Sequence, residues 1–138
     1  MKIMGIPVVF DPRLTQMPAV SRGFWPLKRI VVGPQWYELT PEARVSVLFH
    51  EVHHCLAFHL EVRLAILPLL FIAPRFTRRI CREQELACDR FAASQGWGLE
   101  LARLLEQLHD LPESDFYPTC IERARTLRAH LEDPCSNP

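Results

Sequence analysis

The chain of 138 residues is long enough for one domain with a hydrophobic core and too short for two. Its Lys and Arg residues total 16 and its Asp and Glu residues also total 16, so no net charge attracts it to nucleic acid or to an acidic membrane. Because 49% of the residues are hydrophobic, we expect a single folded domain over residues 1–132, followed by a flexible polar tail at 133–138.

The cysteines favour a reducing compartment. The chain has five of them, an odd number, and no C-x-x-C pair, so free thiols are expected rather than a disulfide framework. Residues 1–7 contain one lysine and a proline and are too short for a signal peptide. We therefore expect a cytoplasmic protein, either free or membrane-associated.

Two short apolar stretches near the N-terminus predict strands. Residues 6–10 are followed by the turn signal Asp11-Pro12, and residues 29–33 end at a glycine before Pro34. These strands are expected to form a small sheet beside the helix that follows.

That helix is predicted from about residue 41 to the low sixties. Thr40 supplies a capping hydroxyl, Pro41 suits the first helical position, and Glu42 places an acid in the first turn. An apolar stripe at helical spacing continues the pattern, made of Val45, Leu48, Phe49, Val52 and Leu56.

Three further helices are predicted downstream. The first covers 77–95 and ends at Gly96, the second covers 99–111 and ends at Pro112, and the third begins near residue 118. The predicted fold class is therefore α+β and mainly helical, with the small sheet beside the long helix.

Residues 64–73 form a run of ten apolar residues. A helix that spans a membrane needs about 20. We interpret the run as a buried or interfacial segment that is kinked at Pro68, with a membrane-facing patch as the alternative.

The strongest functional signal is an H-E-x-x-H motif made by His50, Glu51 and His54. Random shuffling of this composition would produce the motif roughly 0.02 times. On a helix, residues four apart lie on one face, so both imidazoles can reach one Zn²⁺ ion while Glu51 acts on a water molecule as general base. His53 points elsewhere on the helix and is interpreted as a structural residue.

A third metal ligand is expected downstream, where Glu85 and Asp89 lie four apart on one helix face. One of these carboxylates can bind zinc while the other holds an imidazole through its second nitrogen. An ordinary solvated acid pair is the alternative. It is disfavoured because apolar residues flank the pair and unpaired acids are costly on such a face.

The H-E-x-x-H motif at 50–54, followed by E-x-x-x-D at 85–89, resembles the signature of gluzincin metallopeptidases. The resemblance is to the CAAX-prenyl-endopeptidase and HtpX-type family, the beta-lactam-sensor metallopeptidases and the compact minigluzincins, and it covers roughly residues 30–127. It implies a zincin-like fold with His50, His54 and Glu85 as zinc ligands. It further implies Glu51 as catalytic base and Asp89 as the carboxylate that holds a ligand.

A later segment at 117–123 resembles the H-P-x-x-x-E-R sequence of the same family, with Tyr117 in place of the histidine. This implies that Tyr117 and Arg123 lie near the active site, where a phenol can donate a hydrogen bond to a developing oxyanion. The alternatives are that Tyr117 is a helix-capping aromatic residue and that Arg123 orients this segment or pairs with an acid. Another departure is that no apolar segment is long enough to span a membrane, whereas the membrane enzymes of the family have several.

These features predict a zinc-dependent endopeptidase that acts on a peptide or protein substrate. The alternative is a zinc-binding protein without turnover, either a latent sensor or a membrane-associated regulatory module, with contact through residues 64–73. A purely structural zinc site is disfavoured because such sites usually have four protein ligands. A thiolate of Cys81 or Cys88 is a competing zinc ligand, although both fit better as small core residues.

Overall fold

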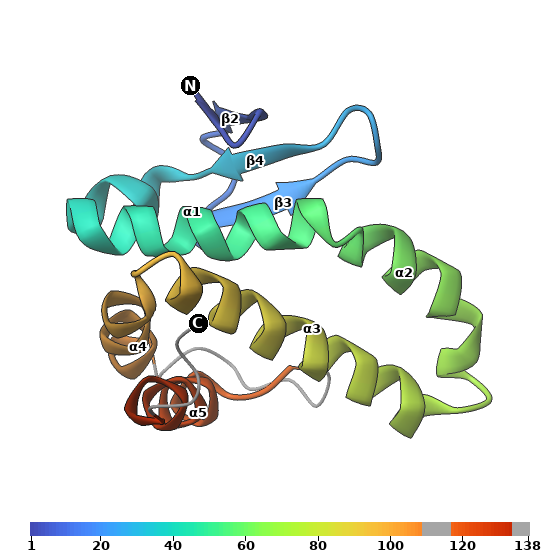
Figure 1. The fold of residues 1–138 in the computed structure, drawn as a ribbon. Coiled ribbons are helices and arrows are strands. Elements are labelled where there is room, and N and C mark those ends of the chain that lie inside the picture. Colours follow the sequence, from blue (N-terminus) through green and yellow to red (C-terminus); the bar gives the residue numbers. More distant parts are fainter. Residues whose placement is uncertain (109–116, 134–138) are drawn as a thin grey trace.

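The computed structural model describes residues 1–108 and 117–133 (Figure 1). A small sheet lies on one side of helix α1, and helices α3, α4 and α5 lie on the other. The strands are β1 (Lys2–Ile3), β2 (Ile6–Phe10), β3 (Ala19–Arg22) and β4 (Arg29–Val32). The helices are α1 (Pro41–Leu56), α2 (His59–Ile66), α3 (Pro74–Ser94), α4 (Gly98–Gln107) and α5 (Cys120–Glu132), with 3-10 turns η1 (Pro34–Glu38) and η2 (Leu67–Leu70). The predicted α+β, mainly helical class is confirmed.

The sheet has the order β1-β2-β4-β3. β2 pairs parallel with β4, whereas β1 pairs antiparallel with β2 and β3 pairs antiparallel with β4. The predicted strands at 6–10 and 29–33 are confirmed as β2 and β4, and the short strands β1 and β3 were not predicted. β3 occupies the edge of the sheet and packs against α1, where the predicted zinc motif lies.

Helix α1 begins as predicted, because the Thr40 hydroxyl accepts a hydrogen bond from the backbone N–H of Ala43. It ends at Leu56 rather than in the low sixties. Phe58 adopts a left-handed conformation with φ of 55°, and Lys28 donates a hydrogen bond to the carbonyl of Cys55 at 2.6 Å. The chain therefore bends and continues as a separate helix, α2, so within the described residues four α-helices follow α1 rather than three.

The downstream helices match the prediction with shifted ends. α3 starts at Pro74 rather than 77, and Gly96 follows it with φ of 86°. The predicted end of the next helix at 111 lies outside the described residues, as do residues 134–138 of the tail predicted at 133–138. The last helix begins at Cys120, after a cap in which the Thr119 hydroxyl accepts from the backbone N–H of Glu122.

The core has two parts. One lies between the sheet and α1 and is formed mainly by Ile6, Ile30, Val32, Trp36, Val47, Leu48 and Val52. The other joins α3, α4 and α5 and is formed by Ala92, Leu101, Ala102, Leu105, Ala124 and Leu127. α1 lies between the sheet and the three helices, so residues on opposite faces of α1 contact different layers (Figure 1).

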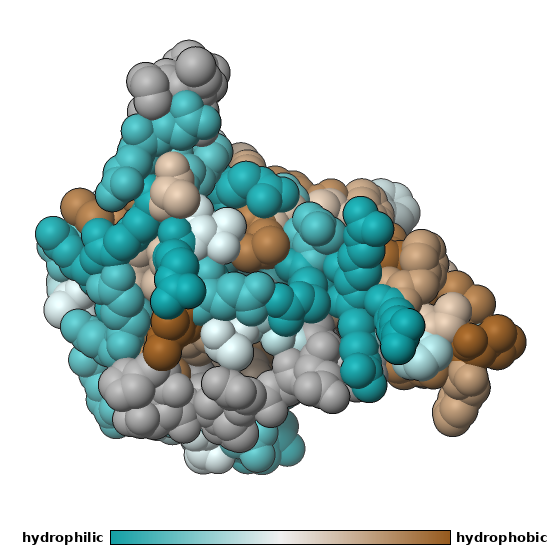
Figure 2. All heavy atoms as spheres, turned by 90° about the horizontal axis from the view of Figure 1, so that it is seen from below, coloured by the Kyte–Doolittle hydropathy of each residue, from teal (hydrophilic) through white to brown (hydrophobic). Residues whose placement is uncertain are grey.

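The expectation that residues 64–73 are buried is wrong, while an interfacial role for them stays a prediction. Phe71 is 92% exposed and Ile72 is 82% exposed, because η2 and the turn into α3 extend beyond the ends of the neighbouring helices. We call the exposed large apolar side chains of this region the apolar tip: Leu64, Leu67, Phe71, Ile72 and Phe76. Figure 2 shows hydrophobic residues gathered at this narrow end of the molecule.

No single helix in the described ranges is long and apolar enough to cross a membrane. α1 taken together with the stretch His59–Leu70 passes the same test of length and composition, as a pair that is bent by 55°.

Candidate metal centre

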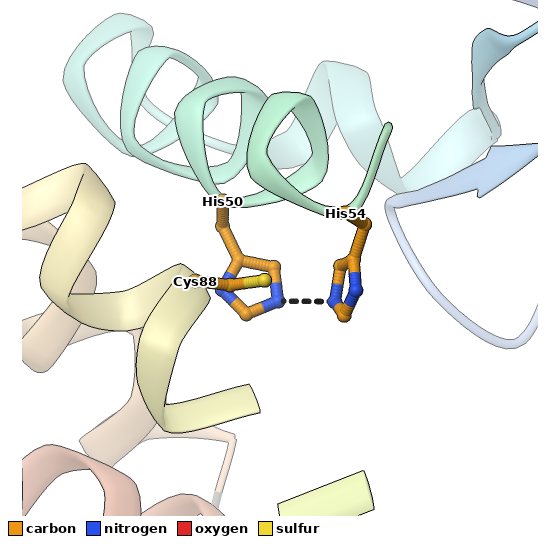
Figure 3. A group of neighbouring side chains, drawn as sticks. All are labelled: His50, His54 and Cys88. Carbon is orange, nitrogen blue, oxygen red and sulfur yellow. Dashed lines mark hydrogen bonds between the residues drawn. The ribbon is translucent and has the colours of Figure 1, made fainter. Parts of the chain in front are cut away.

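Helices α1 and α3 bring the predicted ligands together. His50 and His54 project from α1 toward α3, with their Nε2 atoms 3.2 Å apart (Figure 3). Glu85 on α3 places Oε2 at 3.4 Å from His50 Nε2 and Oε1 at 3.4 Å from His54 Nε2. All three side chains are buried.

These separations fit a metal ion of the size of zinc. A tetrahedral ion with metal–nitrogen and metal–oxygen bonds of about 2.0–2.1 Å separates its ligand atoms by about 3.3 Å. The His50–His54 distance lies close to that value, and each histidine lies 3.4 Å from a different oxygen of Glu85. The donor set, two imidazoles and one carboxylate, is also one that open zinc sites use.

Asp89 holds His50 from the other side of the ring. Its Oδ1 lies 2.9 Å from His50 Nδ1, so this ring N–H donates to the carboxylate and Nε2 is the nitrogen turned toward His54 and Glu85. Arg123 donates to both oxygens of Asp89, at 2.6 and 2.8 Å. The predicted pairing of Arg123 with an acid is thus present, and its Nη1 also lies 3.5 Å from Glu85.

His54 is held by a residue that the sequence did not indicate. Nδ1 of His59 lies 2.9 Å from Nδ1 of His54. In a continuous helix His59 would lie about 140° around the axis from His54. The break at Phe58 brings the two rings together, and no sequence pattern signals that break.

The charges at the centre follow from these contacts. Burial and the guanidinium of Arg123 act to lower the pKa of His50, but hydrogen bonds to Asp89 and Glu85 outweigh them and raise it to about 9. Burial acts to raise the pKa of Glu85, yet hydrogen bonds with His50 and His54 hold it well below its usual range. The carboxylate is therefore ionised, which is the form that binds a metal. His50 is protonated near neutral pH and would lose the proton on Nε2 when a metal binds.

Arg63 on α2 is a second unpredicted neighbour of the centre. Its Nη2 donates to Glu85 Oε1 at 2.7 Å, and its Nε donates to the side chain of Gln84 at the same distance. Its guanidinium also lies 5.4 Å from the centre of the Tyr117 ring. The kink between α1 and α2 is what turns Arg63 toward α3.

Glu51, Tyr117 and Arg123 line one cavity of about 510 Å³ together with the two histidines and Glu85. Glu51 Oε2 accepts a hydrogen bond from the backbone N–H of Ser21 on β3 at 2.6 Å. The cavity is also lined by apolar side chains: Val47, Leu101, Leu104, Leu105, Leu108 and Ile121. The structure thus brings all of the predicted site residues to one cavity or to its immediate surroundings.

Cysteine and histidine side chains offer two other groupings. His50, His54 and Cys88 have ligand atoms within 4.8 Å of one another, as do His53, His59 and Cys88. Burial raises the pKa of the Cys88 thiol, so the sulfur is protonated unless a metal displaces the proton. Burial and the neighbouring histidines lower the pKa of His59 to about 3 and also lower the pKa of His53, so both rings are neutral.

The thiols within the described residues are free, as expected: Cys55, Cys81, Cys88 and Cys120. Cys135, the fifth predicted free thiol, lies outside the described residues. Comparison of the chain with known protein families, with curated proteins and with solved structures found no match.

Proposed function

We propose that the protein is a zinc-dependent endopeptidase with His50, His54 and Glu85 as metal ligands. The observation that carries the proposal is the convergence of these three buried side chains, with distances of 3.2–3.4 Å between them, beside the Glu51 carboxylate in one cavity. Zn²⁺ in such a site supplies Lewis acidity and makes water acidic enough to lose a proton near neutral pH.

Glu51 serves as the general base. It follows His50 directly on α1, so its carboxylate reaches the cavity from a position where it is not needed as a ligand. It takes the proton of the attacking water and later passes it to the leaving amine. Its hydrogen bond with Ser21 holds the carboxylate toward the sheet edge.

Arg123 and Tyr117 are placed for supporting roles. Arg123 keeps Asp89 ionised, because burial acts to raise the pKa of Asp89 while the guanidinium lowers it below its usual range. Tyr117 lines the cavity and is exposed enough to contact a substrate. We propose that its phenol donates to the carbonyl oxygen as charge develops there.

The test uses purified full-length protein with casein as an unstructured substrate. Glu51→Gln should keep one zinc per chain and lose about 10²–10⁴-fold in cleavage rate, because only the base is removed. His50→Ala should lose both zinc and activity. Glu42→Gln, an exposed acid in the first turn of the same helix, is the matched control and should change neither.

A wild-type protein that holds one zinc and cleaves no denatured protein would contradict the endopeptidase proposal. It would support the alternative of a latent sensor or regulatory module that keeps the site without turnover. A chain that binds no zinc in any condition would contradict both.

A second part of the proposal concerns where the protein acts. The apolar tip is followed by Arg75 and Arg79, which are both exposed. Phenylalanine and isoleucine side chains enter the boundary of a bilayer, and adjacent arginines are attracted to anionic headgroups. We propose that the tip docks the protein on an anionic membrane surface, although the chain as a whole carries no net charge.

A further inference from the structure

His53, interpreted from the sequence as a structural residue, belongs to a group of side chains that the proposed peptidase mechanism does not use. Cys88 Sγ lies 3.6 Å from Nδ1 of His53 and 3.5 Å from Nδ1 of His59. Cys88 is fully buried on α3, His59 is buried at the start of α2, and His53 is half-buried on α1. Three different helices therefore direct one ligand atom each to a common point.

These distances match the geometry of a bound ion. A tetrahedral ion with a metal–sulfur bond of about 2.3 Å and a metal–nitrogen bond of about 2.0–2.1 Å separates sulfur from nitrogen by about 3.5 Å. Both sulfur–nitrogen distances lie within 0.1 Å of that value. All three ligand atoms lie within 4.8 Å of one another.

The hydrogen atoms available do not satisfy all of these contacts. When His54 uses Nε2 for the first metal, its Nδ1 carries the proton and donates to Nδ1 of His59. The thiol of Cys88 has one proton, which it can donate to His53. The sulfur and Nδ1 of His59 then face each other with no proton between them, an arrangement that a cation would stabilise.

We propose that His53, His59 and Cys88 form a second metal site for a thiophilic cation of the zinc class. One thiolate and two imidazoles suit zinc and other soft or borderline ions better than magnesium or calcium. The thiol proton leaves to solvent as the metal–sulfur bond forms. The partial exposure of His53 gives access to the site, and His59 also lines a cavity of about 410 Å³.

Filling this site would affect the first one. His59 Nδ1 cannot bind a metal and accept a hydrogen bond from His54 at the same time. Loss of the group that holds a metal-binding imidazole typically costs 10–100-fold in metal affinity or activity. A second ion should therefore weaken the first site, and this consequence, like the proton argument above but unlike the sulfur–nitrogen distances, rests on the proposed function.

The test is a titration of the metal-free full-length protein with Co²⁺, which takes zinc sites and reports thiolate ligands by an intense charge-transfer band. We expect two equivalents to bind, with the thiolate band appearing with the second. Cys88→Ser and His53→Gln should each abolish the band and the second equivalent while retaining the first. His130→Gln, a histidine remote from both sites on α5, should behave like the wild type.

Two results would overturn the second site. One is the absence of a thiolate band at any Co²⁺ concentration that the folded protein tolerates. The other is a band that arrives with the first equivalent and survives in His53→Gln, because Cys88 would then bind the metal of His50 and His54. Circular dichroism of each metal-free variant shows whether it has kept the fold.

The inhibitory effect is measured separately by casein cleavage at one and at two equivalents of Zn²⁺. We expect a 10–100-fold loss at the second equivalent in the wild type and no loss in His53→Gln. If casein is not cleaved at one equivalent, the proposed function fails, while the Co²⁺ titration still decides whether the second site exists. Equal loss in both proteins would contradict the coupling.

Discussion

Oδ1 of Asp89 lies 2.9 Å from Nδ1 of His50, and both side chains are buried between α1 and α3. This contact keeps a proton on Nδ1 of His50. It leaves Nε2 facing His54 and Glu85, so the carboxylate orients the proposed zinc ligand without touching the metal.

We predict that Asp89→Asn lowers zinc affinity about 10–100-fold. The amide keeps the size of the side chain but loses the charge that Arg123 and the His50 ring both contact. The dissociation constant can be measured by competition with a chromogenic chelator. Glu83→Gln, an exposed acid on the same helix, is the control. Unchanged affinity in Asp89→Asn would show that Asp89 serves only the packing of α3 against α5.

A second prediction separates the two candidate donors on α3. Glu85→Gln should weaken binding of the first zinc strongly, because the ionised oxygen is lost, while Cys88→Ser should leave that binding within about threefold. Both affinities can be measured in the same competition assay. The opposite ranking would mean that the group formed by His50, His54 and Cys88 is the ligand set.

Much of this centre could be predicted because it depends on helical spacing. His50 and His54 are four residues apart, as are Glu85 and Asp89, so each pair lies on one face of its helix. The cap at Thr40 and the glycine at 96 mark helix ends by local chemistry, and the structure has both.

What could not be predicted depends on contacts between segments distant in the sequence. Lys28 lies 27 residues before Cys55, whose carbonyl it caps, and this contact accompanies the break at Phe58. That break in turn brings His59 within hydrogen-bond distance of His54, and Arg63 within hydrogen-bond distance of Glu85. The apolar run at 64–73 has the composition of a core segment, and only the direction of α2 leaves it exposed.

The role of Lys28 gives a stability prediction. Its ammonium group donates to the Cys55 carbonyl at the C-terminus of α1 and lies 2.9 Å from Glu61. Lys28→Met keeps an apolar side chain of similar length but removes the charge, and with it the contact of the ammonium group with the Phe58 ring at 3.5 Å. We expect the free energy of unfolding to fall by about 1–3 kcal/mol.

Urea unfolding of the metal-free protein measures this change as a shift in midpoint at constant slope. Lys2→Met, an exposed lysine on β1, is the control and should change the free energy of unfolding by less than about 0.5 kcal/mol. A Lys28 variant as stable as the wild type would show that the bend at Phe58 does not depend on this cap.

The last prediction concerns the apolar tip. Phe71 and Ile72 are the most exposed large hydrophobic side chains of that region, and burial of each in a bilayer boundary contributes about 1.5–3 kcal/mol. The double variant Phe71→Ser, Ile72→Ser should therefore lower binding to vesicles of phosphatidylserine and phosphatidylcholine at least tenfold, as measured by sedimentation. Leu27→Ser is the matched control, because Leu27 is equally exposed but lies in the loop between β3 and β4.

The arginines beside the tip should confer the preference for anionic lipid. An arginine near such a surface contributes about 1 kcal/mol, so Arg75→Gln with Arg79→Gln should weaken binding roughly thirtyfold on anionic vesicles and little on neutral ones. Equal binding of the wild type to both vesicle types would contradict the electrostatic part. If the wild type binds neither and instead self-associates with rising concentration, in a way that Phe71→Ser, Ile72→Ser abolishes, the tip is an interface between copies of the chain. The membrane proposal would then be wrong, because the same apolar side chains would already be covered by protein.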